Sequence, residues 1–237
     1  MNFECASKSD VGLRRKVNED SMLVRTERGL WAVADGMGGH DAGDVASAKV
    51  TEALMGLPIV YGLDALTDTA IAALTRVNQE LIALAGSAAG DRTIGATVVG
   101  VAIAGGEFRC FWAGDSRAYR IRGARIDQLS RDHSLVQGLV DAGMLDPRDA
   151  EHHPNANVVT RAVGVLEDLK VDTVSGDVRP GDHFLLASDG LTRLVDDEEL
   201  AAEVTANRPA DAVDNLVEAA LERGAPDNVS VIIVKVT

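Results

Sequence analysis

Residues 30–47 read Leu-Trp-Ala-Val-Ala-Asp-Gly-Met-Gly-Gly-His-Asp-Ala-Gly-Asp-Val-Ala-Ser. The apolar run Leu30–Ala34 has the length of a strand, and an Ala-rich helical pattern begins near Asp44. Asp35 should therefore lie at the end of the strand, where Gly36 lets the main chain approach a ligand and offers its carbonyl oxygen as a further donor. Because an isolated Asp-Gly pair is usually a turn, a functional role for Asp35 depends on similar groups elsewhere in the chain.

Length and composition predict a single domain covering residues 1–237. A hydrophobic content of 46% is ample for a core, and no repeat, linker or low-complexity segment divides the chain. Aromatic residues make up only 3%, so the core must be built from Val, Leu, Ile and Ala. That composition suits strands covered by Ala-rich helices.

The net charge of −14 argues against a nucleic-acid partner, because binding to a phosphate backbone normally needs a basic surface. The excess of acid is either a solvated surface or carboxylates gathered around cations. No apolar run approaches the roughly 20 residues of a membrane-spanning helix, and charged residues stand where a signal peptide would be apolar. We therefore expect a cytoplasmic monomer with no membrane partner. Cys5 and Cys110 should be free thiols in strands.

Hydrophobic periodicity predicts alternating groups of strands and helices, and the three strands between Thr97 and Ile121 are expected to form an antiparallel meander. Residues 146–157 lack periodicity and predict an exposed loop, and His133 is expected to be structural. The other expected strands are Phe3–Ser7, Ser21–Thr26, Val171–Val178, His183–Ser188 and Val229–Val236; the expected helices are Asp44–Met55, Asp64–Ala85, Leu135–Ala142, Asp196–Asn207 and Ala210–Arg223.

Carboxylates recur at the predicted strand ends, and strand ends at one edge of a sheet can converge. Crowded carboxylates stay ionised together only when cations lie among them, and oxygen-only ligands favour Mg²⁺ or Mn²⁺. Two such ions about 4 Å apart can hydrolyse phosphoryl groups by acidifying a water, and a neighbouring Arg can hold the phosphate. The candidates are Asp35, Asp115, Asp189 and Asp227, with Glu19 and Asp20 before another strand and the Arg14-Arg15 pair nearby.

Seven short motifs follow one another along the chain. They are Gly-Leu-Arg-Arg-Lys-Val-Asn-Glu-Asp, Val-Ala-Asp-Gly-Met-Gly-Gly-His, Gly-Ala-Thr, Ala-Gly-Asp-Ser-Arg, Leu-Ser-Arg-Asp-His-Ser, Ala-Ser-Asp-Gly-Leu and Asp-Asn-Val-Ser. In these motifs and their order, the chain resembles the metal-dependent protein phosphatase (PPM, type-2C) family, in its compact bacterial form, from about Ser9 to Val236. The resemblance implies an α+β fold in which a central antiparallel β-sandwich is flanked by α-helices on both faces.

The same resemblance implies roles for the metal ligands. Asp35 would bridge two catalytic ions, Mn²⁺ or Mg²⁺, and the carbonyl of Gly36 would bind one of them. Asp189 and Asp227 would bind the other ion. Asp115 matches the residue that, with Asp189, holds a third ion in bacterial members.

Further positions carried over by the resemblance concern the second ion and the substrate. Glu19 and Asp20 match an acidic pair beside the second metal, one of which contacts it directly or through water. Arg15 matches the phosphate-binding arginine, with Arg14 as the weaker candidate, and residues 146–157 match a variable flap. Animal members carry a His directly after the Asp-Gly pair as a proposed general acid, whereas this chain has Met37, so the identity of the acid is open; His40 is one candidate.

These features predict a phosphoserine/phosphothreonine protein phosphatase that acts on phosphorylated proteins and opposes a bacterial Ser/Thr kinase. Two alternatives remain open: a stress-response phosphatase acting on an anti-sigma antagonist, and a catalytically inactive module of the same fold that docks a kinase. The complete set of metal-ligand positions argues against the inactive module.

Overall fold

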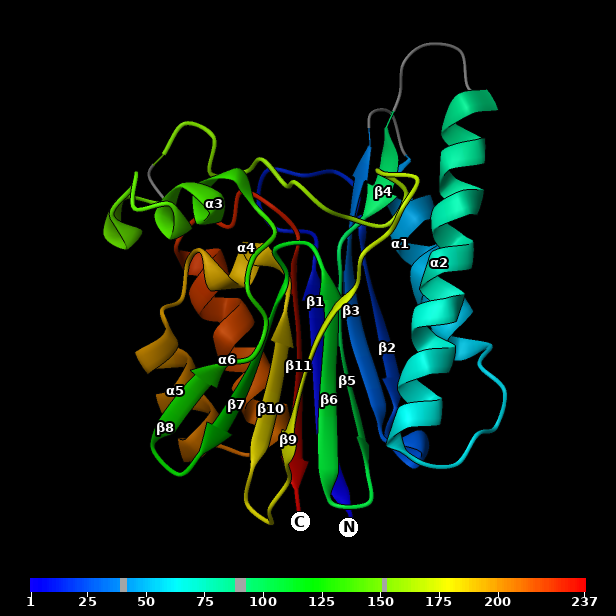
Figure 1. Ribbon diagram of the computed structural model, residues 1–237. Coiled ribbons are helices and arrows are strands. Elements are labelled where there is room, and N and C mark those ends of the chain that lie inside the picture. Colours follow the sequence, from blue (N-terminus) through cyan, green and yellow to red (C-terminus); the bar gives the residue numbers. More distant parts are fainter. Residues whose placement is uncertain (39–41, 88–92, 151–152) are drawn as a thin grey trace.

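A computed structural model describes residues 1–38, 42–87, 93–150 and 153–237. Four layers run across the molecule: helices, sheet, sheet, helices (Figure 1). The termini lie together at one end of the sandwich, and α3, α4 and β4 lie at the other (Figure 1). This arrangement confirms the α+β sandwich predicted from the sequence.

The two sheets are antiparallel throughout. One has the order β1-β11-β10-β7-β8, and the other has the order β2-β3-β5-β6-β9 with β4 paired to β3. The strands are β1 (Phe3–Asp10), β2 (Asp20–Arg25), β3 (Leu30–Gly38), β4 (Ile94–Ala96), β5 (Val98–Ala104), β6 (Glu107–Ala113), β7 (Arg117–Arg122), β8 (Arg125–Gln128), β9 (Asp172–Asp177), β10 (His183–Ala187) and β11 (Val229–Val236).

Each sheet has its own helical cover. Buried side chains of α1 and α2 share one hydrophobic cluster with β3 and β5, and those of α4, α5 and α6 share another with β7, β10 and β11. A third cluster, which includes Trp31, Phe108 and Phe184, lies between the sheets. The helices are α1 (Gly43–Met55), α2 (Leu63–Ser87), α3 (Leu135–Asp141), α4 (Asp189–Thr192), α5 (Asp197–Ala206) and α6 (Pro209–Glu222).

Helix α2 follows its predicted amphipathic pattern for most of its length. Leu66, Leu74 and Leu81 are buried against the sheet, as expected for apolar residues three and four positions apart. Leu84, expected on the same face, is 38% exposed because it lies near the end of the helix. Among the described residues, no helix is both long and apolar enough to cross a membrane.

The predicted meander is wrong. β5 and β6 form a hairpin, but the chain then passes to the other sheet, where β7 pairs with β10 and β8. The crossing occurs at Gly114, whose φ of 133° is accessible mainly to glycine and whose added Cβ would lie 2.4 Å from Thr97 Cβ. The turn therefore places Asp115 between the sheets at the site end of the molecule.

The predicted end of the third strand is also wrong. β3 does not stop at Asp35 but continues to Gly38, because residues 36–38 pair with the short strand β4, which the sequence pattern did not reveal. Asp35 therefore sits inside a strand with both neighbours held by backbone pairing. The short strand β8 and the single-turn helix α4 were likewise not predicted.

Candidate metal centre

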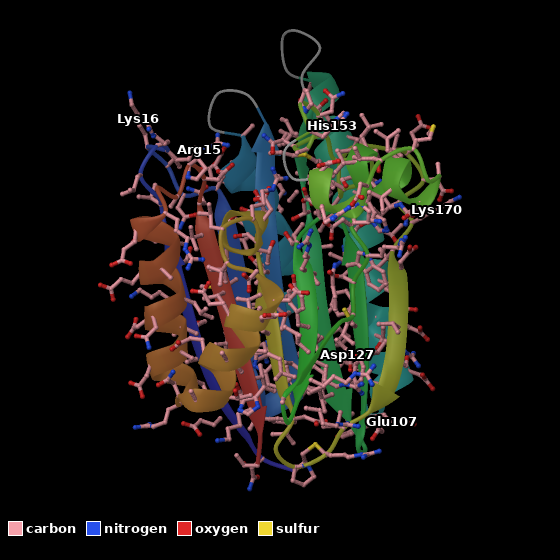
Figure 2. All side chains as sticks on the ribbon, turned by 90° about the vertical axis from the view of Figure 1, so that its left-hand side faces the viewer. Arg15, Lys16, Glu107, Asp127, His153 and Lys170 are labelled. Atoms are coloured by element: carbon pink, nitrogen blue, oxygen red, sulfur yellow. The ribbon has the colours of Figure 1, made fainter. Side chains whose placement is uncertain are left out.

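A cavity of about 300 Å³ opens at the end of the sandwich away from the termini. Arg15 and His153 lie at this end, and Glu107 lies at the opposite one (Figure 2). Seven of the eight predicted site residues line the cavity; they are Arg15, Glu19, Asp35, Gly36, Asp115, Asp189 and Asp227. Thus the carboxylates that the sequence placed at strand ends do converge, although Asp35 lies within β3.

The eighth residue, Asp20, lies beside Asp35 in the β2–β3 pairing, where the two residues are direct partners. Its Oδ2 accepts a hydrogen bond from Ser188 Oγ at 2.8 Å. Its Oδ1 is buried and accepts none. An unpartnered buried carboxylate oxygen is costly unless a cation or a proton satisfies it.

Gly36 allows the backbone to close tightly around the acidic residues. Its N–H donates to the carbonyl of Glu19 at 3.0 Å, and an added Cβ would lie 2.0 Å from the carbonyl oxygen of Gly43. Glu19 is fixed from the other sheet, because its own N–H donates to Asn228 Oδ1 at 2.8 Å. Packing therefore requires glycine at position 36, in addition to the metal-binding role expected for its carbonyl oxygen.

Asp189 and Asp227 approach the cavity from the second sheet. Asp189 follows β10 and begins α4, while Asp227 precedes β11. Gly190 brings the two segments together, since an added Cβ would lie 2.0 Å from the carbonyl oxygen of Asn228. Arg15 reaches across the site and donates to Asp227 Oδ2 at 2.7 Å. The predicted phosphate-binding residue is thus at the edge of the acidic cluster; Arg14 is exposed beside it.

Burial and mutual repulsion raise the pKa values of these carboxylates. Burial is the largest cause for Asp35, whose pKa is raised well above its ordinary value, and the charges of Asp189 and Asp20 add to it. Burial raises the pKa of Asp20 to about 6 and that of Asp115 to about 7. It also raises the pKa of Asp189, although the nearby Arg193 opposes that rise. The cluster as a whole therefore favours protons or metal cations.

The donor set fits two hard divalent ions. All the candidate ligands are oxygens, and the buried Asp20 Oδ1 is an acceptor still without a partner. In the part of the chain that the structure describes, no three His, Cys, Asp or Glu side chains already surround a single point. Asp227 Oδ2 instead accepts a hydrogen bond from Arg15 Nη2 at 2.7 Å. The cavity therefore holds the ligands for such ions, with Asp227 in a salt bridge.

A guanidinium lies at the position expected for a third ion. Arg193 Nη2 lies 2.9 Å from Asp189 Oδ2 and 3.3 Å from Asp115 Oδ2, so a guanidinium already pairs with both carboxylates. Sequence reasoning missed Arg193. Its spacing of four residues from Asp189 was the available signal, because residues four apart share one face of a helical turn.

The histidines at this end of the molecule differ in their contacts. His133 stacks on Trp112 and its Nδ1 accepts a hydrogen bond from the N–H of Gly114 at 3.1 Å, which agrees with the structural role expected for it. His153 Nδ1 accepts from the N–H of Asn155. His40, a candidate proton donor, and His152 lie outside the described residues.

Comparisons with known proteins agree with this geometry. The family model described as protein phosphatase 2C matches residues 14–223. The chain is 35% identical over 241 residues to the serine/threonine protein phosphatase PstP of Mycobacterium tuberculosis, covering 98% of this chain and 44% of that protein. It is 34% identical over 238 residues to the protein phosphatase PhpP of Streptococcus pneumoniae, covering 98% and 97%. It thus spans less than half of PstP but nearly all of PhpP.

Solved structures give the same result. PppA, titled a key regulatory component of T6SS in Pseudomonas aeruginosa, is 44% identical with a TM-score of 0.92, covering 100% of this chain and 99% of that one. The catalytic domain of PstP in complex with two manganese ions is 34% identical with a TM-score of 0.87, covering 99% of each chain.

Proposed function

The chain belongs to the protein phosphatase 2C family, and we propose that it is a metal-dependent protein serine/threonine phosphatase. One observation supports this most strongly: four aspartates from both sheets line one cavity, a fifth, Asp20, pairs with Asp35 beside it, and the Arg15 guanidinium lies at its edge. Crowded carboxylates call for divalent cations, and a flanking arginine suits a phosphate dianion. Hydrolysis of a phosphoserine or phosphothreonine ester needs both.

We assign the ligands as the family resemblance implies. Asp35 and the Gly36 carbonyl would hold one ion of Mn²⁺ or Mg²⁺. Asp35, Asp189 and Asp227 would hold the other. Glu19 or Asp20 would contact the second metal directly or through a water molecule. When bound, such ions acidify a water and screen the charge of the phosphoryl oxygens. Asp35 suits the bridging role because strand pairing on both sides fixes its backbone.

Arg15 is the residue proposed to bind the phosphate. Its guanidinium is half-exposed and bonded to Asp227, so an incoming phosphate can compete for the same donors without crossing a buried region. Arg14 is exposed and has a smaller part in this proposal. Residues 146–157 border the cavity through Asn157 and are proposed to contact the protein substrate.

In the cell, we propose that the enzyme removes phosphate from proteins modified by a bacterial Ser/Thr kinase, as a cytoplasmic monomer. The similarity to PppA, a protein titled as a regulatory component of T6SS, and to PstP and PhpP supports a signalling role. Phosphoproteomics of a strain lacking the protein, complemented with the wild type or with Asp35→Asn, tests this role. Sites that rise in the deletion and stay high only with Asp35→Asn are the expected substrates; an unchanged phosphoproteome contradicts it.

Metal dependence tests the chemistry itself. Hydrolysis of phosphothreonine peptides and of p-nitrophenyl phosphate should require Mn²⁺ or Mg²⁺ and stop in EDTA. Asp35→Asn and Asp189→Asn should each lower kcat at least 1,000-fold in saturating Mn²⁺, whereas the exposed control Glu218→Gln should retain it. Full turnover by metal-stripped wild type, or by either Asp→Asn variant, would contradict the assignment.

A further inference from the structure

Arg193 pairs with two of the aspartates that line the cavity. It follows α4, four residues after Asp189, and pairs with Asp189 Oδ2 at 2.9 Å and Asp115 Oδ2 at 3.3 Å. Asp115 is only 5% exposed. The guanidinium is therefore the cation that compensates two carboxylates, one of them almost fully buried.

The backbone and a third contact fix this guanidinium in place. The N–H of Arg193 donates to the carbonyl of Asp189 at 3.0 Å, which holds the two residues on one turn. Nη2 also donates to the carbonyl oxygen of Ala156 at 3.3 Å, in the loop beside the cavity. An arginine stays protonated at every accessible pH, so this cation is permanent.

We propose that Arg193 is a resident cation that takes the place of a third divalent ion between Asp115 and Asp189 and anchors the segment 153–157, through Ala156, to the metal centre. The inference rests on the proposed function, because it assumes that two ions bind elsewhere in the same cavity. A divalent ion between these carboxylates would lie against the guanidinium, and like charges repel. Asp115 is then satisfied by a side chain of this chain and contributes no ligand to a metal.

Counting bound ions tests the proposal without using activity. Equilibrium dialysis and calorimetric titration of the metal-stripped 237-residue chain with Mn²⁺ should give two ions per chain for the wild type. Arg193→Gln should bind a third ion at least tenfold more tightly than the wild type does, because two unpaired carboxylates become available. Arg193→Lys, which keeps the charge, should stay at two, as should the matched surface control Arg208→Gln, whose side chain is 76% exposed.

Asp115→Asn, with Arg193 unchanged, is a second variant for the same ion count, and it tests the proposal even if Arg193→Gln fails to fold. It should still bind two ions. Three ions in the wild type, one of them lost in Asp115→Asn, would overturn the inference while leaving the proposed function intact. No Mn²⁺ binding by the wild type at all would overturn both.

The loop contact has its own readout. Hydrogen exchange at residues 155–158, measured in EDTA, should be at least fivefold faster in Arg193→Gln than in the wild type or in Arg208→Gln, because the bond to the Ala156 carbonyl is lost. Unchanged exchange there would refute the anchoring part of the proposal.

Discussion

Asp20→Asn should stabilise the metal-free protein at neutral pH. The pKa of Asp20 is raised from 3.8 to about 6, chiefly by burial, with the charges of Asp189 and Asp227 adding to the rise. Each tenfold difference in proton affinity corresponds to about 1.4 kcal/mol, so keeping this carboxylate ionised costs about 3 kcal/mol in the folded state. The amide of Asn has nearly the same shape, carries no charge, and its oxygen can still accept the Ser188 hydrogen bond. Its NH2 takes the place of Oδ1, so one buried polar group lacks a partner in both proteins and only the charge differs.

The sign follows from proton linkage. Between about pH 4 and pH 6 the folded state binds more protons at Asp20 than the unfolded state does, so stability falls as the pH rises through this window and the cost is complete above it. The variant avoids that cost. Its advantage should be about 3 kcal/mol at pH 8 and should vanish by pH 4.

Thermal unfolding in EDTA at pH 4, 6 and 8 measures this. For a chain of 237 residues, an unfolding entropy of about 2 cal/mol/K per residue converts 3 kcal/mol into a Tm rise of about 6 °C at pH 8. Glu218→Gln, an exposed acid on α6, should change Tm by less than about 1 °C. A Tm equal to or below that of the wild type at pH 8, or a gain that persists at pH 4, would refute the reasoning. Saturating Mn²⁺ should reverse the order where Asp20, rather than Glu19, is the residue that contacts the ion, because the wild type then has a carboxylate ligand that the variant lacks.

Three further outcomes are expected. Arg15→Ala should raise KM for phosphopeptides about 10- to 100-fold by removing charge-assisted hydrogen bonds to phosphate, and Arg14→Ala less than threefold; steady-state kinetics showing the reverse order would exchange their roles. Gly190→Ala should lower stability by at least about 2 kcal/mol in urea unfolding, since its Cβ would lie 2.0 Å from the Asn228 carbonyl oxygen; an unchanged midpoint contradicts this. Deleting residues 147–150 should change kcat/KM for protein substrates yet leave p-nitrophenyl phosphate turnover within about twofold; loss of both would give the loop a catalytic part.

Much of the site could be predicted because polar residues at the ends of apolar strands leave a local signal. Asp35, Asp189 and Asp227 each adjoin a run of apolar residues, which marks them in the sequence even though β3 continues past Asp35 to Gly38. The helices and most strands were predicted for the same reason, since periodicity depends only on neighbouring residues. The motif resemblance then supplied the roles, which distances in the sequence alone do not contain.

What could not be predicted depends on contacts between distant segments. Residues 36–38 continue β3 because β4 pairs with them, and β4 has only three residues and no pattern of its own. The chain changes sheets at Gly114 rather than continuing the meander, which only packing against Thr97 makes visible. The pairing of Arg193 with Asp115 joins residues 78 positions apart, and only the spacing of four from Asp189 left a local signal for Arg193.

The acidic residues of the cavity belong to both halves of the sandwich. Asp20 and Asp35 come from β2 and β3, whereas Asp189 and Asp227 adjoin β10 and β11 of the other sheet. Metal supply and protein lifetime are therefore linked. An ion held by residues of both sheets raises the free energy of unfolding by about 2.7 kcal/mol when its concentration is a hundred times Kd. Without the ion, the negative charges on the two sheets repel each other. A cell starved of divalent metal would then lose the polypeptide to proteases as well as its activity, and pulse proteolysis with and without Mn²⁺ should show the shorter survival directly.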